Sequence, residues 1–211
     1  MTDFNNVRRE LESALSPKRY RHVLSVVKEV EALADIFAVN NKDELISAAL
    51  LHDCTKPLDF EAQKELAKSL SVPLSSDDLK SPEVLHAKTG AAKALKDYGV
   101  SRETSEMIFC HCTGKKNMRL EEKLLFLADF IEETRTYDTC LKIRKIFYKE
   151  ISSAENYGKK LYILDKTLID VIKATLEHLN EKNVFVHPET VDALDSLEKS
   201  LQNPTSYKKE D

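Results

Sequence analysis

Turn-forming residues are scarce in this sequence, which has only 4 glycines and 6 prolines among 211 residues. Proteins built from many short strands need frequent turns, so this scarcity argues against an all-β fold and for helices with few connections. Hydrophobic residues nevertheless make up 42% of the chain, an ordinary share for a globular protein with a real core. We therefore predict an all-α protein, and its length suits a single domain over residues 1–211.

Long apolar runs, charge of one sign and paired cysteines are also missing. No apolar stretch approaches the roughly 20 residues of a transmembrane helix, and the N-terminus lacks the basic-then-apolar order of a signal peptide. The 32 basic and 36 acidic residues are well mixed, and no basic stripe indicates nucleic-acid binding. The four cysteines form no CxxC pair. We interpret them as reduced thiols of a cytoplasmic protein that has neither a membrane nor a nucleic-acid partner.

Helical periodicity dominates the chain. Residues 71–82 are rich in turn formers and predict a loop, and residues 183–190, NVFVHPET, form the only stretch that reads as extended. Ser16 and Pro17 supply an N-cap and a first-turn proline. Periodicity and caps predict helices over residues 2–14, 17–37, 42–53, 59–69, 82–97, 119–135, 138–156, 164–182 and 190–201, with another that begins at the cap Ser101.

The apolar run AALLHDCTK, residues 48–56, contains the adjacent pair His52 and Asp53. Burying an imidazole and a carboxylate costs free energy unless each finds a partner. That partner can be a neighbouring side chain or a metal ion. Alone, the dipeptide is a weak signal, because one such pair arises readily by chance in a chain of this length.

Two more polar residues lie in apolar settings on other predicted helices. His22 lies one turn into a well-capped helix, and Asp129 interrupts the run LLFLADFI. Taken alone, His22 is better explained as a half-buried structural histidine, and Asp129 is as well explained by a basic partner as by a metal. Together with His52 and Asp53 they give two imidazoles and two carboxylates on three helices. Such a mixed set suits iron, manganese, zinc or cobalt.

The order His, His-Asp, Asp resembles the HD superfamily of metal-dependent phosphohydrolases. Five blocks in order, RYRHVLSV, AALLHDCTK, HAKTGA, HCTGKKNM and LLFLADFIEETR, resemble the YqeK family within it over about residues 17–190. Members of that family are symmetrical bis(5′-nucleosyl)-tetraphosphatases, which split diadenosine tetraphosphate into two ADP. The resemblance implies an HD-domain helical bundle with a central metal site. Its core would span about residues 17–135, and helices over residues 138–201 would pack on it and close the nucleotide site.

The resemblance also implies roles for individual residues. An iron ion would be bound by His22, His52, Asp53 and Asp129, with manganese, cobalt or zinc as other candidates. Catalysis would fall to Asp53, His86, His111 and Lys56, and His86 with His111 could complete a second metal site. The substrate, a dinucleoside polyphosphate that yields ADP, would contact His22, Asp53, Cys54, Thr55, Lys56, His86, His111, Cys112, Asp129, Arg135, Phe185, Val186, His187, Pro188, Glu189 and Thr190. A homodimer is a further expectation.

The chemistry of these residues fits such a reaction. A divalent metal lowers the pKa of its water, and Asp53 can both bind the metal and accept a proton. Lys56 and Arg135 can neutralise phosphate oxygens, and His86 or His111, if protonated, could act as a general acid.

Two positions depart from the family. They are Cys54, where an aromatic residue is common, and Cys112, where threonine or serine is more frequent. Neither departure touches the four metal ligands, but both could alter contacts to the nucleotide.

Two other functions stay open at this point. One is a different HD-type nucleotide phosphohydrolase or phosphodiesterase, and the other is a non-catalytic nucleotide-sensing module. The intact set of ligands disfavours the sensing module, because a protein that has lost its catalytic activity has no need to keep all four ligands. The segment Cys110-His111-Cys112 could suggest zinc, but zinc sites usually space their cysteines by two or more residues and no second pair follows.

Overall fold

The computed structural model describes residues 4–203 and residue 207, which contain helices and no β-strand. The prediction of an all-α fold is therefore confirmed. The elements are α1 (Phe4–Ala14), α2 (Pro17–Ile36), α3 (Lys42–Leu51), α4 (Phe60–Ser69), α5 (Ser76–Lys80), the 3-10 helix η1 (Pro82–Val84), α6 (Leu85–Asp97), α7 (Arg102–Cys110), α8 (Leu120–Ile131), α9 (Asp138–Ser152), α10 (Tyr157–Glu181) and α11 (Pro188–Gln202). No helix of the described part is both long and apolar enough to cross a membrane.

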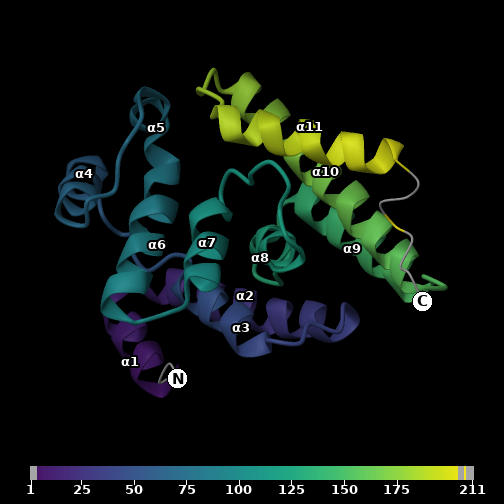
Figure 1. The fold of residues 1–211 in the computed structure, drawn as a ribbon, viewed down its shortest axis with the longest axis horizontal. Coiled ribbons are helices and arrows are strands. Elements are labelled where there is room, and N and C mark those ends of the chain that lie inside the picture. The colour runs from purple at the N-terminus through teal and green to yellow at the C-terminus, as the bar shows by residue number, and fades with distance from the viewer. Residues whose placement is uncertain (1–3, 204–206, 208–211) are drawn as a thin grey trace.

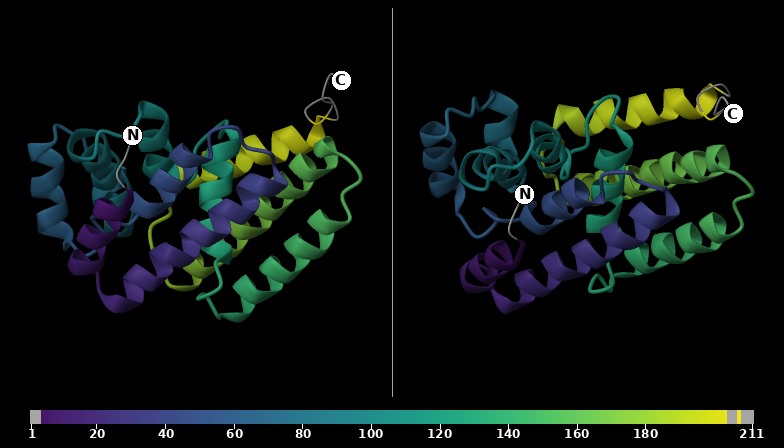
Figure 2. Two further views of the ribbon diagram at one scale, coloured as in Figure 1. Left: turned by 90° about the horizontal axis from the view of Figure 1, so that it is seen from below. Right: turned by 60° about the horizontal axis from the view of Figure 1, so that its bottom comes forward.

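Helix α8 lies at the centre of the fold. It contacts α2, α3, α7, α9 and α10, and Figure 1 shows it end-on with the other helices around it. Its sequence explains this position, because Leu124, Leu125, Leu127 and Ala128 are all fully buried. Helices α9, α10 and α11 run side by side at the C-terminal end of the fold (Figure 2). Asp129 of α8 thereby lies where the N-terminal and C-terminal helices meet.

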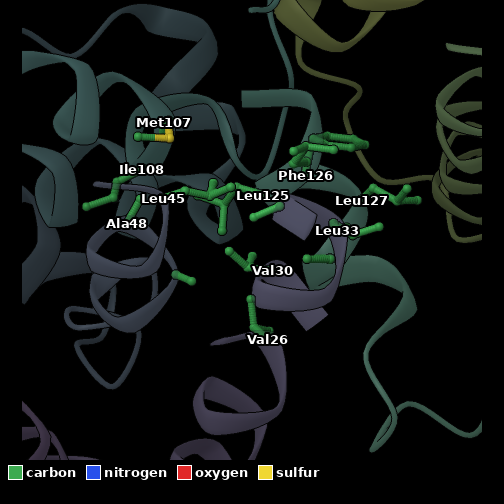
Figure 3. Close-up of a cluster of buried hydrophobic side chains, with 14 of the residues drawn as sticks. Val26, Val30, Leu33, Leu45, Ala48, Met107, Ile108, Leu125, Phe126 and Leu127 are labelled. Atoms are coloured by element: carbon green, nitrogen blue, oxygen red, sulfur yellow. The ribbon is translucent and has the colours of Figure 1, made fainter. Parts of the chain in front are cut away.

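The core beneath the site is built from helical stripes. Val26, Val30 and Leu33 recur on one face of α2, as the 3.6-residue period requires, and all three are fully buried. They pack with Leu45 of α3 and Leu125 of α8 (Figure 3). Burying each such side chain contributes about 1.5–3 kcal/mol. This packing holds α2, α3 and α8 rigidly together at the point where their polar residues emerge.

Two predicted N-caps are confirmed, because the side chains of Ser16 and Ser101 each accept a backbone hydrogen bond three residues on. Helix α3, however, stops at Leu51 rather than at residue 53. His52 and Asp53 therefore lie in the turn that follows the helix. Residues 2–3 of the first predicted helix lie outside the described residues.

Other boundaries also correct the prediction. The predicted loop at residues 71–82 contains α5, because the side chain of Ser75 caps the amide of Asp78 and the Asp78 carboxylate accepts from the amide of Ser75. Helix α10 starts seven residues earlier than predicted, at Tyr157 after the cap Asn156.

The ends of three predicted helices are wrong as well. Helix α6 begins at Leu85, after η1, rather than at residue 82, and α9 ends at Ser152 rather than at residue 156. Helix α8 ends at Ile131, because the next residue, Glu132, leaves helical geometry with a ψ of 154°. The extended reading of residues 183–190 is wrong at both ends, since Asn183 has a positive φ of 51° and Pro188 already begins α11. Residues 184–187 between them lie in no helix, and His187 has extended backbone.

Candidate metal centre and nucleotide cavity

His52 is held at the end of α3 by its own backbone. Its ring is fully buried, and its Nδ1 lies 2.7 Å from the carbonyl oxygen of Ala49, three residues earlier. The last carbonyls of a helix lack helical partners, and a carbonyl can only accept a hydrogen bond. Nδ1 must therefore carry the hydrogen, which leaves the lone pair of Nε2 free to point into the site.

The same arrangement recurs at His86 and His111. The Nδ1 of His86 lies 2.8 Å from the carbonyl oxygen of Glu83, and the Nδ1 of His111 lies 2.6 Å from that of Ile108. Each acceptor again belongs to the residue three positions earlier. Both imidazoles are buried. The structure therefore fixes three rings so that each directs an Nε2 lone pair toward the same region, an arrangement typical of metal-binding histidines.

The Nε2 atoms meet in two pairs that share one carboxylate. Those of His22 and His52 are 3.4 Å apart, and those of His86 and His111 are 3.3 Å apart. Asp53 lies between the pairs, with Oδ2 3.5 Å from the Nε2 of His52 and Oδ1 3.2 Å from the Nε2 of His86. The site thus consists of two neighbouring groups of ligand atoms joined by Asp53.

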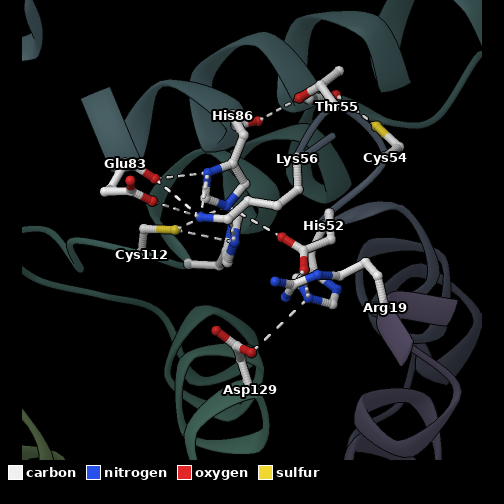
Figure 4. Close-up of polar contacts among 12 residues, drawn as sticks. Arg19, His52, Cys54, Thr55, Lys56, Glu83, His86, Cys112 and Asp129 are labelled. Atoms are coloured by element: carbon white, nitrogen blue, oxygen red, sulfur yellow. Dashed lines mark hydrogen bonds and ion pairs between the residues drawn. The ribbon is translucent and has the colours of Figure 1, made fainter. Parts of the chain in front are cut away.

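Asp129 approaches the first group from α8. Its Oδ1 lies 3.0 Å from the Nε2 of His22 and 4.0 Å from the Nε2 of His52, and Figure 4 shows the Asp129 side chain facing this group. Asp129 also accepts a 2.7 Å hydrogen bond from Arg135. The structure therefore brings together His22, His52, Asp53 and Asp129, as the sequence predicted. Two imidazoles and two carboxylates form a donor set that fits a first-row divalent metal.

Electrostatics keeps both carboxylates of this set ionised. Burial raises the pKa of Asp53, but the polar groups around the carboxylate outweigh burial and hold that pKa well below its usual range. Arg19 pairs with the same carboxylate at 2.7 Å. Burial likewise raises the pKa of Asp129, and Arg135 with His22 brings it well below the usual range. Both residues therefore offer negative charge to a cation at any ordinary pH.

The histidines divide into two classes. Burial lowers the pKa of His22, but hydrogen bonds to Asp129 and Glu132 outweigh it and raise the pKa to about 9. Burial lowers the pKa of His86. Burial, assisted by the neighbouring His52 and His86, lowers the pKa of His111 to about 3. His86 and His111 are therefore neutral, which suits ligands and disfavours the general-acid role.

A cavity of about 400 Å³ opens onto these ligands, a size within the range of small-molecule sites. His111, Cys112 and Asp129 lie at its polar end, and Lys56 and Arg135 add two cations. The rest of the wall is largely apolar and comes from segments far apart in the sequence, with Pro82, Val84, Phe126, Phe130, Val171, Leu179, Val184 and Phe185. Such a cavity suits a ligand with a flat apolar group and a negatively charged end.

A model of the HD domain family matches residues 19–134, more than half of the 211 residues. The chain belongs to the HD domain family. It is 32% identical over 196 residues to the symmetrical bis(5′-nucleosyl)-tetraphosphatase of Staphylococcus aureus (strain NCTC 8325 / PS 47), a match that covers 91% of this chain and 93% of that protein. It is 30% identical over 181 residues to the protein of the same name from Bacillus subtilis (strain 168), which covers 85% of this chain and 89% of the relative.

A solved structure with the same fold supports the membership. It is the crystal structure of a predicted HD superfamily hydrolase involved in NAD metabolism from Clostridium acetobutylicum. The two structures superpose with a TM-score of 0.83 and 28% sequence identity, over 94% of this chain and 98% of the other. The structural similarity therefore extends beyond the matched residues 19–134 to the C-terminal helices.

Several residues expected at the nucleotide do line the cavity of this HD domain. They are Lys56, His111, Cys112, Asp129, Arg135, Phe185, His187 and Thr190. Cys54 and Thr55 lie elsewhere, because the Cys54 thiol points to the carbonyl of Gly90, 4.0 Å away, and the Thr55 hydroxyl donates to the carbonyl of His86 at 2.9 Å. Thr55 thus helps to hold α6 against the turn after α3.

The closing segment at residues 183–190 contributes only in part. Glu189 accepts a 3.1 Å hydrogen bond from Thr113, and Pro188 begins α11. Val186, Pro188 and Glu189 are not among the residues that line the cavity. His187 lies at the cavity wall and contacts Asp78 at 3.2 Å. The segment therefore reaches the cavity through Val184, Phe185, His187 and Thr190.

Glu132 is a residue of the HD domain site that sequence reasoning missed. It is fully buried, and its carboxylate accepts from the Nδ1 of His22 at 3.0 Å and from the hydroxyl and amide of Thr134. A carboxylate behind a metal-binding histidine fixes the ring and raises its basicity. The available signal was spacing, because Glu132 follows Asp129 by three residues, roughly one helical turn.

Arg19 is the second residue that was missed. It lies three residues before His22 on α2, so the two share a face of the helix. Its guanidinium donates a 2.7 Å hydrogen bond to Oδ2 of Asp53 (Figure 4). Arg19 therefore orients the carboxylate that joins the two groups of ligands.

The Glu132→Gln variant should bind metal about 10- to 100-fold more weakly, because an amide cannot support the imidazole of His22 as a carboxylate does. Competition against a chelator of known affinity measures the change. Glu133→Gln is the matched control, because Glu133 is exposed and pairs with Lys28 on the surface. Equal affinities in the two variants would show that Glu132 does not act through His22.

Metal affinity of the metal-free protein should rise with pH from neutrality to about pH 9. His22, with its pKa raised to about 9, carries a proton on Nε2 below that value, and a metal ion must displace this proton. One displaced proton makes the apparent affinity rise by up to about tenfold per pH unit and then level off. Chelator competition across this range measures the slope, and a flat profile would contradict the prediction.

Proposed function

We propose that this HD domain protein is a metal-dependent hydrolase that cleaves diadenosine tetraphosphate symmetrically into two ADP. The observation that carries the proposal is the cavity, in which two cations and an apolar wall meet the ligand set at one end. Relatives that match nearly the whole chain are named as symmetrical tetraphosphatases, which supports this substrate class. The symmetry of cleavage rests on these relatives, and the phosphate and base contacts rest on the cavity.

Different residues would bind the metal, accept the proton and hold the phosphates during phosphoanhydride hydrolysis. His22, His52, Asp53 and Asp129 would hold the metal, which supplies Lewis acidity to activate water and offset phosphate charge. Asp53, ionised and oriented by Arg19 at 2.7 Å, would accept the proton of the attacking water. Lys56 and the Arg135 guanidinium would hold the phosphate oxygens.

Iron is the metal that we propose for the first group of ligands, on the strength of the resemblance to the YqeK family. The donor set also suits manganese, cobalt and zinc. Metal analysis of the purified protein tests the assignment. A stoichiometric content of another metal, in a protein that turns over substrate, would replace iron in the proposal.

We further propose one domain over residues 1–211, located in the cytoplasm. Support for a single domain comes from one buried hydrophobic cluster that runs from Val7 of α1 to Leu197 of α11. A homodimer stays a prediction from the sequence.

Product identification is the experiment that tests the proposed function. The purified, metal-loaded protein is incubated with diadenosine tetraphosphate, and the products are separated by chromatography. ADP as the sole product supports the proposal, whereas AMP with ATP contradicts symmetrical cleavage. Absence of turnover in the metal-loaded protein would favour a nucleotide-sensing module. NAD is a useful second substrate, since its cleavage alone would point to a different HD-type phosphohydrolase.

The Lys56→Ala variant should lower kcat/KM by about 10- to 100-fold, the value of one charge-assisted hydrogen bond to phosphate. Metal at the first ligand group should not change, because Lys56 lies outside that group, with its Nζ 3.3 Å from the Nδ1 of His86. Steady-state kinetics and metal analysis measure the two effects. Lys145→Ala, on the exposed face of α9, is the control. Loss of metal in Lys56→Ala would assign Lys56 a structural role instead.

A further inference from the structure

Cys112 completes a triangle with the second pair of histidines. Its Sγ lies 3.2 Å from the Nε2 of His86 and 3.2 Å from the Nε2 of His111, and these two nitrogens are 3.3 Å apart (Figure 4). The three ligand atoms come from two different segments, α6 and the turn after α7. Each atom can therefore reach one common point.

The hydrogen bonds around this triangle leave more acceptor lone pairs than hydrogens. The Nδ1 hydrogens of His86 and His111 are already donated to the carbonyls of Glu83 and Ile108. Both Nε2 atoms therefore present lone pairs, and the thiol of Cys112 has only one hydrogen for the two of them. Buried acceptors without donors are costly, and a cation at the centre of the triangle would satisfy all three atoms.

The resemblance to the YqeK family already implies that His86 and His111 could hold a second metal ion. We propose that Cys112 is the third protein ligand of that ion, and that its thiolate makes the site selective for zinc over harder ions. The inference deepens the proposed metal-dependent function and rests on it. Thiolate and imidazole together favour zinc, whereas a nitrogen and oxygen set does not discriminate. On binding, the thiol releases its proton to solvent and the sulfur coordinates as thiolate.

The position of the triangle suits an ion that faces substrate. His111 and Cys112 both line the nucleotide cavity. Three protein ligands with one open position are typical of catalytic rather than structural zinc. Asp53, whose Oδ1 lies 3.2 Å from the Nε2 of His86, connects this group to the first one. A second ion here would therefore contact the same phosphate chain as the first.

Cys110 offers a matched comparison within the same segment. It is fully buried, but its thiol points away from the triangle, to the carbonyl of Met107 at 3.7 Å. The Cys110-His111-Cys112 run therefore supplies two ligands, and His86 of α6 supplies the third. Cys110→Ser changes a buried thiol without touching the proposed site.

Titration of the metal-free protein with cobalt(II) tests the proposal, because a thiolate ligand produces a near-ultraviolet charge-transfer band. We expect wild type and Cys110→Ser to bind two equivalents and to show the band with one of them. Cys112→Ser should bind the second equivalent at least about 10-fold more weakly and lose the band. Absence of the band from wild type at two equivalents would overturn the proposal, as would its persistence in Cys112→Ser.

Two further measurements keep the test decisive. Circular dichroism establishes that Cys112→Ser retains its helices, and if it does not, Cys112→Thr replaces it. Competition between zinc and manganese for wild type should favour zinc at the second equivalent, and equal binding would remove the claimed selectivity. The band does not depend on turnover. A protein with the band and no hydrolysis would overturn only the proposed function, and one with hydrolysis and no band would overturn only the second site.

Discussion

The His52→Ala variant should lose its metal at the first group of ligands and hydrolyse diadenosine tetraphosphate at least about a thousandfold more slowly. A bound metal contributes several kcal/mol of transition-state stabilisation. A loss of about 4 kcal/mol corresponds to a roughly thousandfold lower rate. His52 is fully buried and its Nδ1 is fixed on the carbonyl of Ala49. The variant therefore lacks the Nε2 ligand that this fixed ring presents to the site.

Metal analysis and single-turnover hydrolysis measure this effect on the same preparation. His178→Ala is the control, since His178 is an exposed histidine of α10 outside both groups of ligands. Far-ultraviolet circular dichroism checks that the helices persist. Wild-type activity in His52→Ala would refute the site, whatever the metal content.

The Asp53→Asn variant should be the second most damaging change, again with a loss of about a thousandfold or more. The substitution keeps the shape of the side chain and removes its charge. That charge is present at every assay pH, because the pKa of Asp53 lies well below its usual range and Arg19 pairs with the carboxylate. Asparagine would also leave the guanidinium of Arg19 without its carboxylate.

Asp53→Asn differs from His52→Ala in its effect on the second group of ligands. Asp53 contacts both His52 and His86, whereas the Nε2 of His52 faces the first group. We therefore expect Asp53→Asn to weaken both cobalt equivalents and His52→Ala to spare the thiolate band. Asp97→Asn is the control, because Asp97 is exposed and pairs with Lys93 on the surface. If Asp53→Asn weakened only one equivalent, Asp53 would not be shared between the two groups.

Much of the fold followed from local sequence signals. Few glycines and prolines, a strong helical period and the caps Ser16 and Ser101 predicted an all-α chain correctly. Helix ends were predicted less well, because an end is decided by capping contacts and packing as much as by period. Helix α5 shows why, since a five-residue helix has almost no period and depends on the capping box of Ser75.

The first group of ligands was also accessible from sequence. His22, His52, Asp53 and Asp129 are polar residues in apolar settings, and burial without a partner would be costly for each. The structure brings all four together. Apolar patterning indicates which polar residues are buried, and buried polar residues must find one another or a cation.

The sequence by itself therefore determined the helical class. It also identified the polar residues that cannot be buried without a partner. Only the tertiary structure decided how those residues are used. The position of Glu132 behind His22, the place of Asp53 between two pairs of imidazoles and the meeting of Cys112 with His86 all depend on distances between helices. No local pattern contains those distances, because they arise when α2, α3, α6, α7 and α8 pack against one another. The hydrogen on the Nδ1 of His22 was decided in the same way, by the carboxylate of Glu132. Those on His52, His86 and His111 depend instead on carbonyls three residues earlier in the same segment.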